Sequence, residues 1–212
     1  MTLELLARLI ESARATIESR AIELDALDEA IGDGDHGTNL ARGLDAIAAR
    51  QQEFVGLGWG AALERMAAIL ERETGGAGGT YYAALLGGMG QAAPADSRIG
   101  VSDLARMLRA GVEAVQAKGG ARKGDKTMLD VLLPVAQVMD TLVAEGRVEQ
   151  IGARLLAAGA HGLHATTHMV AKHGLAADLE VASVNRLDPG ACSCALLIGA
   201  CVGVLETPAQ AA

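Results

Sequence analysis

Apolar residues recur every three or four positions through most of this chain, and glycine-rich or proline-containing segments interrupt that spacing. Such spacing places the apolar side chains on one face of an α-helix, and it predicts eight helices. They cover residues 2–28, 38–52, 60–73, 80–92, 102–117, 127–145, 148–173 and 191–205. Residues that favour strands are sparse, and no segments alternate as paired strands do. The sequence therefore predicts an all-α protein with a single domain over residues 1–212.

Capping residues and helix breakers predict where several of these helices begin and end. Thr38 is expected to cap the second helix, because a hydroxyl can accept a hydrogen bond from a free N–H of the first turn. Thr127 and Asp130 have the spacing of a capping box at the start of the sixth helix. The glycines at 75–79 predict a break, and residues 174–188, which lack a helical period, predict a loop.

The charge balance and the aromatic content exclude one class of partner. The chain has 26 acidic and 18 basic residues, a formal net charge of −8, and only one Trp, two Tyr and one Phe. A protein that binds the phosphate backbone of nucleic acids needs a basic face, and single-strand binders stack bases on aromatic rings. We therefore expect no nucleic acid partner.

The longest nearly apolar run covers residues 191–205. It is shorter than the ~20 residues that a membrane-spanning helix needs, so it is interpreted as a buried core helix and no membrane partner is expected. Its cysteines, Cys192, Cys194 and Cys201, are odd in number and do not suggest a disulfide framework. They are interpreted as core residues of a reduced protein, which predicts a cytoplasmic location.

Three carboxylates lie close together in the glycine-rich segment 28–39. Asp33 and Asp35 flank a single glycine, so a turn can point both at one place, and Asp28 lies shortly before them. Clustered carboxylates repel one another unless water or a cation neutralises them, and a hard cation such as Mg²⁺ prefers carboxylate oxygens. The segment therefore indicates either a Mg²⁺ site or a solvated turn before a helix.

Three further predicted helix starts offer free backbone N–H groups. The glycines at 75–79 precede a helix, and glycine lets an anion approach the N–H groups and the positive end of the helix dipole. Segments 124–130 and 188–190 also lead into helices. Each of these is equally typical of an ordinary helix end, and no Walker A or dinucleotide fingerprint accompanies them. Taken singly, they allow an anion site without requiring one.

Four motifs in a fixed order provide a stronger indication than any one of them alone. They are LDALDEAIGDGDHGTNLARG at 24–43, TGGAGGT at 74–80, GDKTMLDVLLP at 124–134 and LDPGA at 187–191. Together, in an all-helical chain of this size, they resemble the L subunit of bacterial dihydroxyacetone kinase. The equivalent domain is the nucleotide-binding half of the ATP-dependent enzymes of that family. The resemblance runs from the first predicted helix to the last.

The resemblance implies an antiparallel eight-helix barrel that holds ADP or ATP between loops at one end. It implies that Asp28, Asp33 and Asp35 bind two Mg²⁺ ions that bridge the nucleotide phosphates. It also implies nucleotide contacts from all four motifs and from the loop before the third. The residues at those positions are His36, Asn39, Gly75, Gly76, Ala77, Gly119, Thr127, Met128, Asp188, Pro189 and Gly190.

The same resemblance implies a division of labour between subunits. The family transfers a phosphoryl group to a small ketose, such as dihydroxyacetone, that a separate K subunit holds. In the phosphoenolpyruvate-linked members a phosphotransferase-system protein rephosphorylates bound ADP, whereas ATP-using members exchange the nucleotide. Phosphoryl transfer needs alignment and charge neutralisation more than covalent chemistry, so no catalytic base is assigned in this chain.

One stretch departs from the family pattern. Family members carry a lid loop with two arginines before the Asp-Pro-Gly turn, and residues 174–183 contain neither arginine. Lys172 or, alternatively, Arg186 is a candidate substitute for a nucleotide-holding arginine. The altered lid leaves two alternatives open. One is a non-catalytic regulatory or assembly member of the same fold, and the other is an ATP-dependent kinase subunit for another keto-sugar such as a tetrulose.

Overall fold

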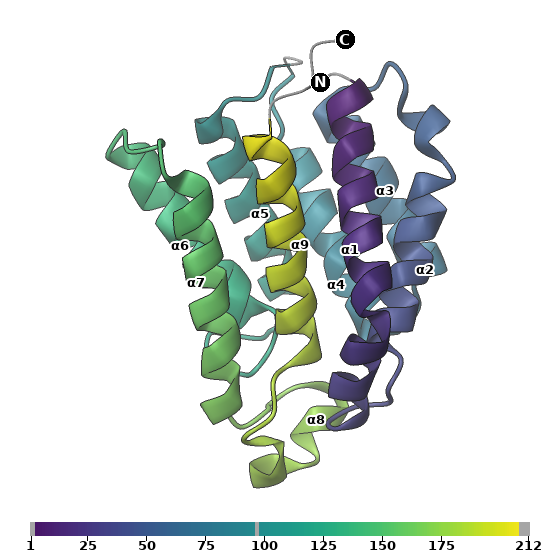
Figure 1. Ribbon diagram of the computed structural model, residues 1–212, viewed down its shortest axis with the longest axis vertical. Coiled ribbons are helices and arrows are strands. Elements are labelled where there is room, and N and C mark those ends of the chain that lie inside the picture. The colour runs from purple at the N-terminus through teal and green to yellow at the C-terminus, as the bar shows by residue number, and fades with distance from the viewer. Residues whose placement is uncertain (1–2, 96–97, 208–212) are drawn as a thin grey trace.

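The computed structural model describes residues 3–95 and 98–207, and within these ranges it contains helices and no strands (Figure 1). The all-α prediction is therefore confirmed. The long helices are α1 (Leu3–Glu29), α2 (His36–Ala48), α3 (Trp59–Glu73), α4 (Gly76–Gln91), α5 (Val101–Gly119), α6 (Leu129–Ala144), α7 (Ile151–Ala165) and α9 (Pro189–Glu206). The short segments are α8 (Gly174–Ala177) and the 3-10 turns η1 (Gln51–Phe54), η2 (Thr166–His168) and η3 (Glu180–Ser183).

Neighbouring long helices pack side by side along the length of the molecule (Figure 1). Each helix from α1 to α7 contacts the next, α7 contacts α9, and α9 returns to α1. The buried apolar residues of these helices form one hydrophobic core, which includes Ile17, Leu40, Met107 and Val131. The more specific antiparallel barrel implied by the resemblance stays a prediction.

Glycine lets two of these helices approach closely. A Cβ placed at Gly88 of α4 would lie 2.7 Å from the carbonyl oxygen of Ala110 in α5. A Cβ at Gly111 of α5 would likewise lie 2.7 Å from the carbonyl oxygen of Leu85 in α4. Because real Cβ atoms need more room than this, any side chain at either position would force α4 and α5 apart.

Helix α4 begins earlier than predicted, inside the glycine run. Gly75 and Gly76 have left-handed φ angles of 71° and 62°, so the change of direction falls on these two residues. Gly79 is then already helical and packs on Thr74, where a Cβ would lie 2.5 Å from the Cβ of that residue. The prediction of a break through residue 79 was therefore wrong, because only the first two glycines serve as the turn.

Helix α7 ends earlier than predicted, at Ala165 rather than near residue 173. The hydroxyls of Thr166 and Thr167 donate to the carbonyl oxygens of Leu163 and His164, each at 2.7 Å. The chain tightens there into η2 and then becomes extended. The predicted loop over 174–188 contains α8 and η3, so it is less irregular than expected.

Thr38 is not the cap of α2, which begins at His36. The backbone N–H of Thr38 donates to Oδ1 of Asp25 at 2.9 Å, and its hydroxyl donates to Oδ2 at 2.5 Å. A carboxylate of α1 therefore satisfies the first turn of α2 from outside. Helix α6 begins at Leu129 with Met128 at the N-cap position, so Thr127 is not the cap residue, although Asp130 Oδ2 accepts the N–H of Thr127 at 2.9 Å.

The C-terminal helix α9 is long and apolar enough, by length and composition, to cross a membrane, and a third of it is buried. It packs on α1 and α7 within the described structure. Cys192 and Cys194 are buried as expected, whereas Cys201 is exposed. The interpretation as a core helix therefore applies best to the first half of α9.

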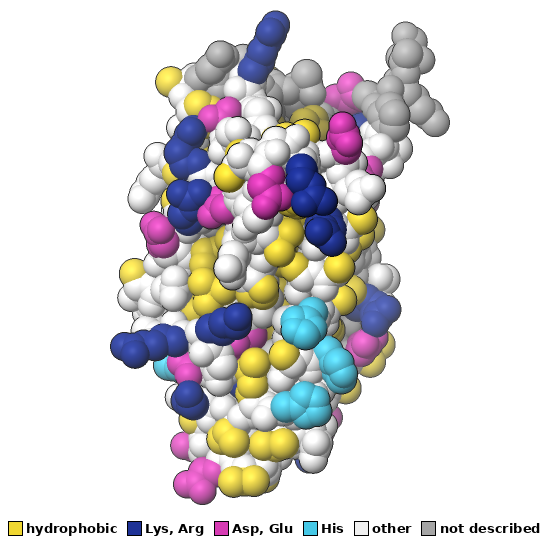
Figure 2. All heavy atoms as spheres, turned by 90° about the vertical axis from the view of Figure 1, so that its left-hand side faces the viewer, with side chains coloured by type: hydrophobic (Ala, Val, Ile, Leu, Met, Phe, Trp, Pro, Cys, Tyr) yellow, Lys and Arg dark blue, Asp and Glu magenta, His cyan; other side chains and the backbone are white. Residues whose placement is uncertain are grey.

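Three exposed histidines gather on the side of the molecule formed by α7 and η2 (Figure 2). They are His161, His164 and His168, and the ring centroids of the last two are 5.8 Å apart. None of them lines the cavity described next.

Candidate functional site

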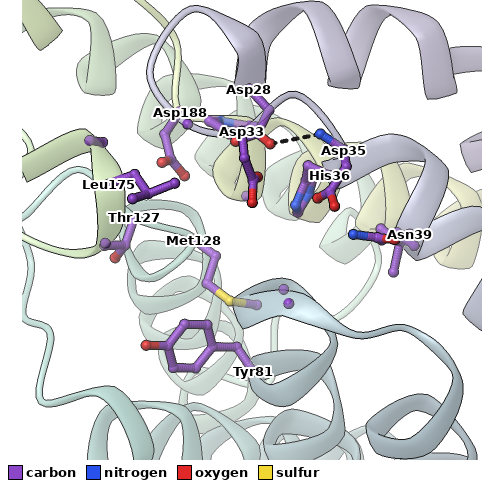
Figure 3. Close-up of a pocket in the computed structure, with 18 of the residues that line it drawn as sticks. Asp28, Asp33, Asp35, His36, Asn39, Tyr81, Thr127, Met128, Leu175 and Asp188 are labelled. Atoms are coloured by element: carbon purple, nitrogen blue, oxygen red, sulfur yellow. Dashed lines mark hydrogen bonds between the residues drawn. The ribbon is translucent and has the colours of Figure 1, made fainter.

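A cavity of about 350 Å³ opens where five loops and helix starts meet (Figure 3). Its size suits a small-molecule ligand. The contributors are the α1–α2 loop with α2, the start of α4, the loop before α6, the segment after η2, and the start of α9. The lining residues include Asp28, Asp33, Asp35, His36, Asn39, Thr74, Gly75, Gly76, Gly78, Tyr81, Tyr82, Lys126, Thr127, Met128, His173, Gly174, Leu175, Ala176, Asp188, Pro189 and Gly190.

The three aspartates singled out in the sequence converge on one side of this cavity (Figure 3). Each of Asp28, Asp33 and Asp35 offers a carboxylate oxygen, and these oxygens lie within 4.8 Å of one another. Asp28 is half-buried and the other two are exposed to the cavity side. Such a cluster of hard oxygen donors fits a divalent cation such as Mg²⁺, which offsets the mutual repulsion of the carboxylates.

Asp28 also shapes the loop that carries the other two aspartates. Its Oδ2 accepts the backbone N–H groups of Gly34, at 3.0 Å, and of Asp35, at 3.1 Å. Gly34 has a φ of 80°, which a side chain would strain. A Cβ at Gly32 would overlap Oδ1 of Asp28. The glycines of this motif are therefore needed for the loop to close around Asp28.

His36 is connected to the interior through a serine. Its Nε2 lies 2.8 Å from Oγ of Ser193, which also lies 2.7 Å from the hydroxyl of Tyr82. Ser193 Oγ also lies within hydrogen-bond distance of the carbonyl oxygen of Gly190, at 3.1 Å. Burial lowers the pKa of His36, against the opposing charge of Asp28 and its neighbours. The lowered pKa favours the neutral ring, whose Nδ1 faces Gly78.

The start of α4 faces this histidine across the cavity. Gly75, Gly76 and Gly78 line the cavity, and the free N–H groups of a helix start carry partial positive charge. Ala77 lies in the first turn of α4, but its side chain is outside the described part of the structure. Thr74 Oγ1 is buried and has no hydrogen-bond partner among the described residues. This oxygen faces α2, where a Cβ at Gly43 would overlap it.

The opposite side of the cavity comes from the loop before α6 and from the start of α9 (Figure 3). Asp188 caps α9 by accepting the N–H of Ala191 at 2.7 Å, and burial raises its pKa to about 7. The Nζ of Lys126 donates to the carbonyl oxygens of Thr166, at 2.5 Å, and of Arg186. Burial lowers the pKa of Lys126. These bonds hold the two loops together below Thr127, Met128, Pro189 and Gly190.

Several residues lie elsewhere than the sequence suggested. Gly119 does not line the cavity and instead packs against the ring of Tyr81. Lys172 and Arg186, named above as substitutes for the missing arginine, do not line the cavity. Lys172 Nζ instead pairs with Asp125 Oδ1 at 2.8 Å, and Arg186 is exposed. Asn39 does line the cavity, and its Oδ1 accepts from Arg42 at 2.6 Å.

The residues that line the cavity but were not among the predicted site residues include Thr74, Tyr81, His173 and Leu175. Thr74 stands inside a quoted motif, and the signal that was overlooked is its position directly before the glycines. Tyr81 follows the same motif by one residue. Leu175 lies in the stretch that departs from the family pattern, His173 lies two residues before Leu175, and no motif points to either.

Comparison with known proteins adds independent findings. Residues 30–203 match the family model described as the DAK2 domain. The chain is 31% identical over 183 residues to the ADP-binding subunit DhaL of PEP-dependent dihydroxyacetone kinase 2 from Listeria innocua, with 85% of both chains covered. It is 32% identical over 204 residues to D-erythrulose kinase from Mycolicibacterium smegmatis, covering 93% of this chain and 35% of that enzyme.

A solved structure has the same fold. The dihydroxyacetone kinase from C. freundii, in complex with AMP-PNP and Mg²⁺, superposes with a TM-score of 0.70 at 24% sequence identity. The match covers 96% of this chain and 34% of that one. The chain thus spans most of the Listeria subunit but about a third of each of the longer kinases.

Proposed function

Because the chain belongs to the DAK2 domain family, a family of nucleotide-binding kinases, we propose that it binds ADP or ATP with Mg²⁺ and transfers a phosphoryl group to a small ketose. Dihydroxyacetone and a tetrulose such as erythrulose are the acceptors that the names of its relatives suggest. The proposal includes two Mg²⁺ ions at Asp28, Asp33 and Asp35.

One observation carries this proposal. The carboxylate cluster and the glycine-rich start of α4 border the same cavity, although they are far apart in the sequence. A cation site and a ready-made anion site that share one cavity suit a metal-bound polyphosphate better than either ligand alone.

The residues of this chain would act by holding the nucleotide and orienting its phosphates. When bound, Mg²⁺ supplies positive charge that offsets the charge on the phosphate oxygens. The N–H groups at Gly75 and Gly76 would orient the phosphates from the other side. Met128 and Pro189 would contact the base and sugar of the nucleotide with apolar surface. Asp188 would keep the start of α9 in place through its bond to Ala191.

The acceptor would come from a partner. We propose that a ketose-binding K subunit docks over the cavity and that a phosphotransferase-system protein is the phosphoryl donor in a phosphoenolpyruvate-linked system. The support is that the chain spans 85% of a relative named as one subunit of a PEP-dependent kinase. Any base or covalent anchor for the ketose then belongs to the partner, and a cytoplasmic location is part of this proposal.

The test is a calorimetric titration of the purified chain with ADP and ATP, with and without Mg²⁺. Wild type and the control Asp45→Asn, an exposed residue of α2 outside the cavity, should bind nucleotide only with Mg²⁺. Asp33→Ala should lose this binding. A ligand at about 100 times its Kd stabilises the fold by ~2.7 kcal/mol, so thermal unfolding provides a second readout.

The outcomes of this titration distinguish the phosphoenolpyruvate-linked, the ATP-dependent and the regulatory alternatives. ADP that copurifies and does not exchange would indicate the phosphoenolpyruvate-linked mode, whereas freely exchanging ATP would indicate an ATP-dependent kinase. If wild type binds neither nucleotide even with a K subunit present, the proposal is wrong and the regulatory reading of the fold replaces it.

A further inference from the structure

A buried carboxylate outside the aspartate cluster joins two walls of the cavity. Asp125, in the loop before α6, is 8% exposed. Its Oδ1 accepts from Lys172 Nζ at 2.8 Å, and its Oδ2 lies 3.1 Å from His173 Nε2. Its own carbonyl oxygen accepts the N–H of Lys172 at 3.2 Å. Asp125 therefore makes three bonds to two consecutive residues far away in the sequence.

Those two residues lead directly into the segment that covers the cavity. We call residues 171–185 the lid segment. His173, Gly174 and Leu175 of the lid segment line the cavity, and Leu175 faces it beside Thr127 (Figure 3). On the other side of Asp125, the next residues along the chain also line the cavity. A displacement of Asp125 would therefore shift residues on both walls of the cavity.

The described hydrogen bonds that join the lid segment to the rest of the protein lie near its two ends. At one end Asp125 holds Lys172 and His173, and at the other the N–H of Asn185 donates to Thr167 O at 2.7 Å. Between these ends, the backbone hydrogen bonds of α8 and η3 stay inside the lid segment. The apolar side chains of Leu175 and Val181 are 57% and 73% exposed. Inside the lid segment, the fully buried Ser183 Oγ accepts the N–H of Ala171 at 2.9 Å, so the segment is braced internally and is joined to the rest of the protein near its ends.

The Asp125 contacts are of the strong kind. The hydrogen bond from Lys172, with help from the N–H of Arg122 and from His173, lowers the pKa of Asp125 to about 2. The carboxylate is thus charged throughout the neutral range, and hydrogen bonds to a charged group contribute more than neutral ones. Within this pair the Asp125 side chain is 11% exposed, whereas the Lys172 side chain is 61% exposed.

We propose that Asp125 is a positioning residue that holds the lid segment over the cavity through Lys172 and His173 and thereby sets how long a nucleotide stays bound. This inference rests on the proposed nucleotide-binding function. Asp125 itself does not line the cavity, so it acts through the residues it holds. Lys172 likewise holds the lid segment and does not bind the nucleotide phosphates.

The experiment compares Asp125→Asn and Lys172→Met with wild type by two measurements. The first is amide hydrogen exchange of residues 173–182 without nucleotide, and the second is the dissociation rate of a fluorescent ADP analogue with Mg²⁺. Both variants should exchange faster in the lid segment and release the analogue about tenfold faster, the factor expected for the loss of ~1.4 kcal/mol of charged hydrogen bonding. Lys172→Arg, which keeps the charge, should restore wild-type values.

Asp140→Asn is the matched control. It breaks the exposed ion pair of Asp140 with Arg109, whose shorter contact is 2.6 Å, between α5 and α6 and away from the lid segment. Its lid exchange and dissociation rate should equal those of wild type. Lys172 is 61% exposed, so Lys172→Met should fold even if Asp125→Asn does not.

Two results would overturn the inference. The first is a lid segment that exchanges at the wild-type rate in Lys172→Met, and the second is faster lid exchange with an unchanged dissociation rate. If wild type binds no nucleotide analogue at all, the proposed function fails instead, and the exchange measurement on the nucleotide-free protein still decides whether Asp125 holds the lid segment.

Discussion

Asp28 Oδ2 accepts the backbone N–H of Asp35 at 3.1 Å, so one member of the carboxylate cluster positions another. The same oxygen accepts from Gly34, and the loop between α1 and α2 closes around it. Asp28 therefore has two roles that a change of side chain can separate. One is to order the loop through a hydrogen-bond acceptor, and the other is to supply negative charge for a cation.

Replacing Asp28 by Asn and by Ala should separate these roles. Asparagine keeps an oxygen acceptor for Gly34 and Asp35 but loses the charge, so Asp28→Asn should retain thermal stability and lose Mg²⁺-dependent nucleotide affinity. Asp28→Ala should lose that affinity and also ~1–3 kcal/mol of stability, because two N–H groups lose their partner. Equal stability of the two variants would contradict the loop-ordering role.

Thr74→Val should stabilise the nucleotide-free protein and weaken nucleotide binding. The hydroxyl of Thr74 is buried without a partner, and valine has nearly the same shape, so the substitution removes a desolvation cost of about 1 kcal/mol. If a phosphate oxygen accepts from this hydroxyl, affinity for ADP with Mg²⁺ should fall about tenfold. Thermal unfolding and calorimetry measure the two effects. An unchanged affinity would show that the hydroxyl does not meet the nucleotide.

Ser193→Ala should loosen His36 without touching the cavity surface. Ser193 Oγ lies 2.8 Å from His36 Nε2 and 2.7 Å from the Tyr82 hydroxyl, so its removal takes a hydrogen-bond partner from both groups. We expect a loss of about 2 kcal/mol in unfolding free energy and a weaker nucleotide affinity. The ¹⁵N shifts of the His36 ring report the tautomer directly. Ser19→Ala, on the exposed side of α1, should change none of these quantities.

Asp188 should make the stability of the nucleotide-free protein depend on pH. Burial raises its pKa in the folded state to about 7 from 3.8, so its contribution is greatest at acid pH and disappears as the pH rises through 7. A difference of about 3 units corresponds to at most ~4 kcal/mol. Asp188→Asn keeps the oxygen that caps Ala191 and should lack this dependence.

Urea unfolding of both proteins in chelator between pH 4.5 and 8 measures this effect. Wild type should lose stability relative to Asp188→Asn between pH 4.5 and 7, and the difference should level off above that range. A constant difference across the series would mean that Asp188 is ionised in the folded state at all these pH values.

Helical periodicity determined the fold class of this protein, because the period of apolar residues is a local property of the chain. The predicted helices are present in the structure, but several of their ends are shifted. Single interactions determine the residue at which each helix begins or ends. Thr38 illustrates the point, since its partner Asp25 lies in the preceding helix and no local rule identifies it. Likewise, only the left-handed φ angles of Gly75 and Gly76 show which glycines of the run form the turn.

The sequence by itself also determined which motifs carry the polar residues of the site, since Asp, Gly and Thr cluster there for reasons of turn geometry and charge. Tertiary structure decided which residues meet. His36 and Ser193 are 157 positions apart and yet share a hydrogen bond, and Gly119 lies behind Tyr81 rather than in the cavity. The hydrogen bond to Asp125 likewise places Lys172 outside the cavity. Such pairings depend on how the helices pack, and packing is a property of the whole chain that spacing along the sequence does not contain.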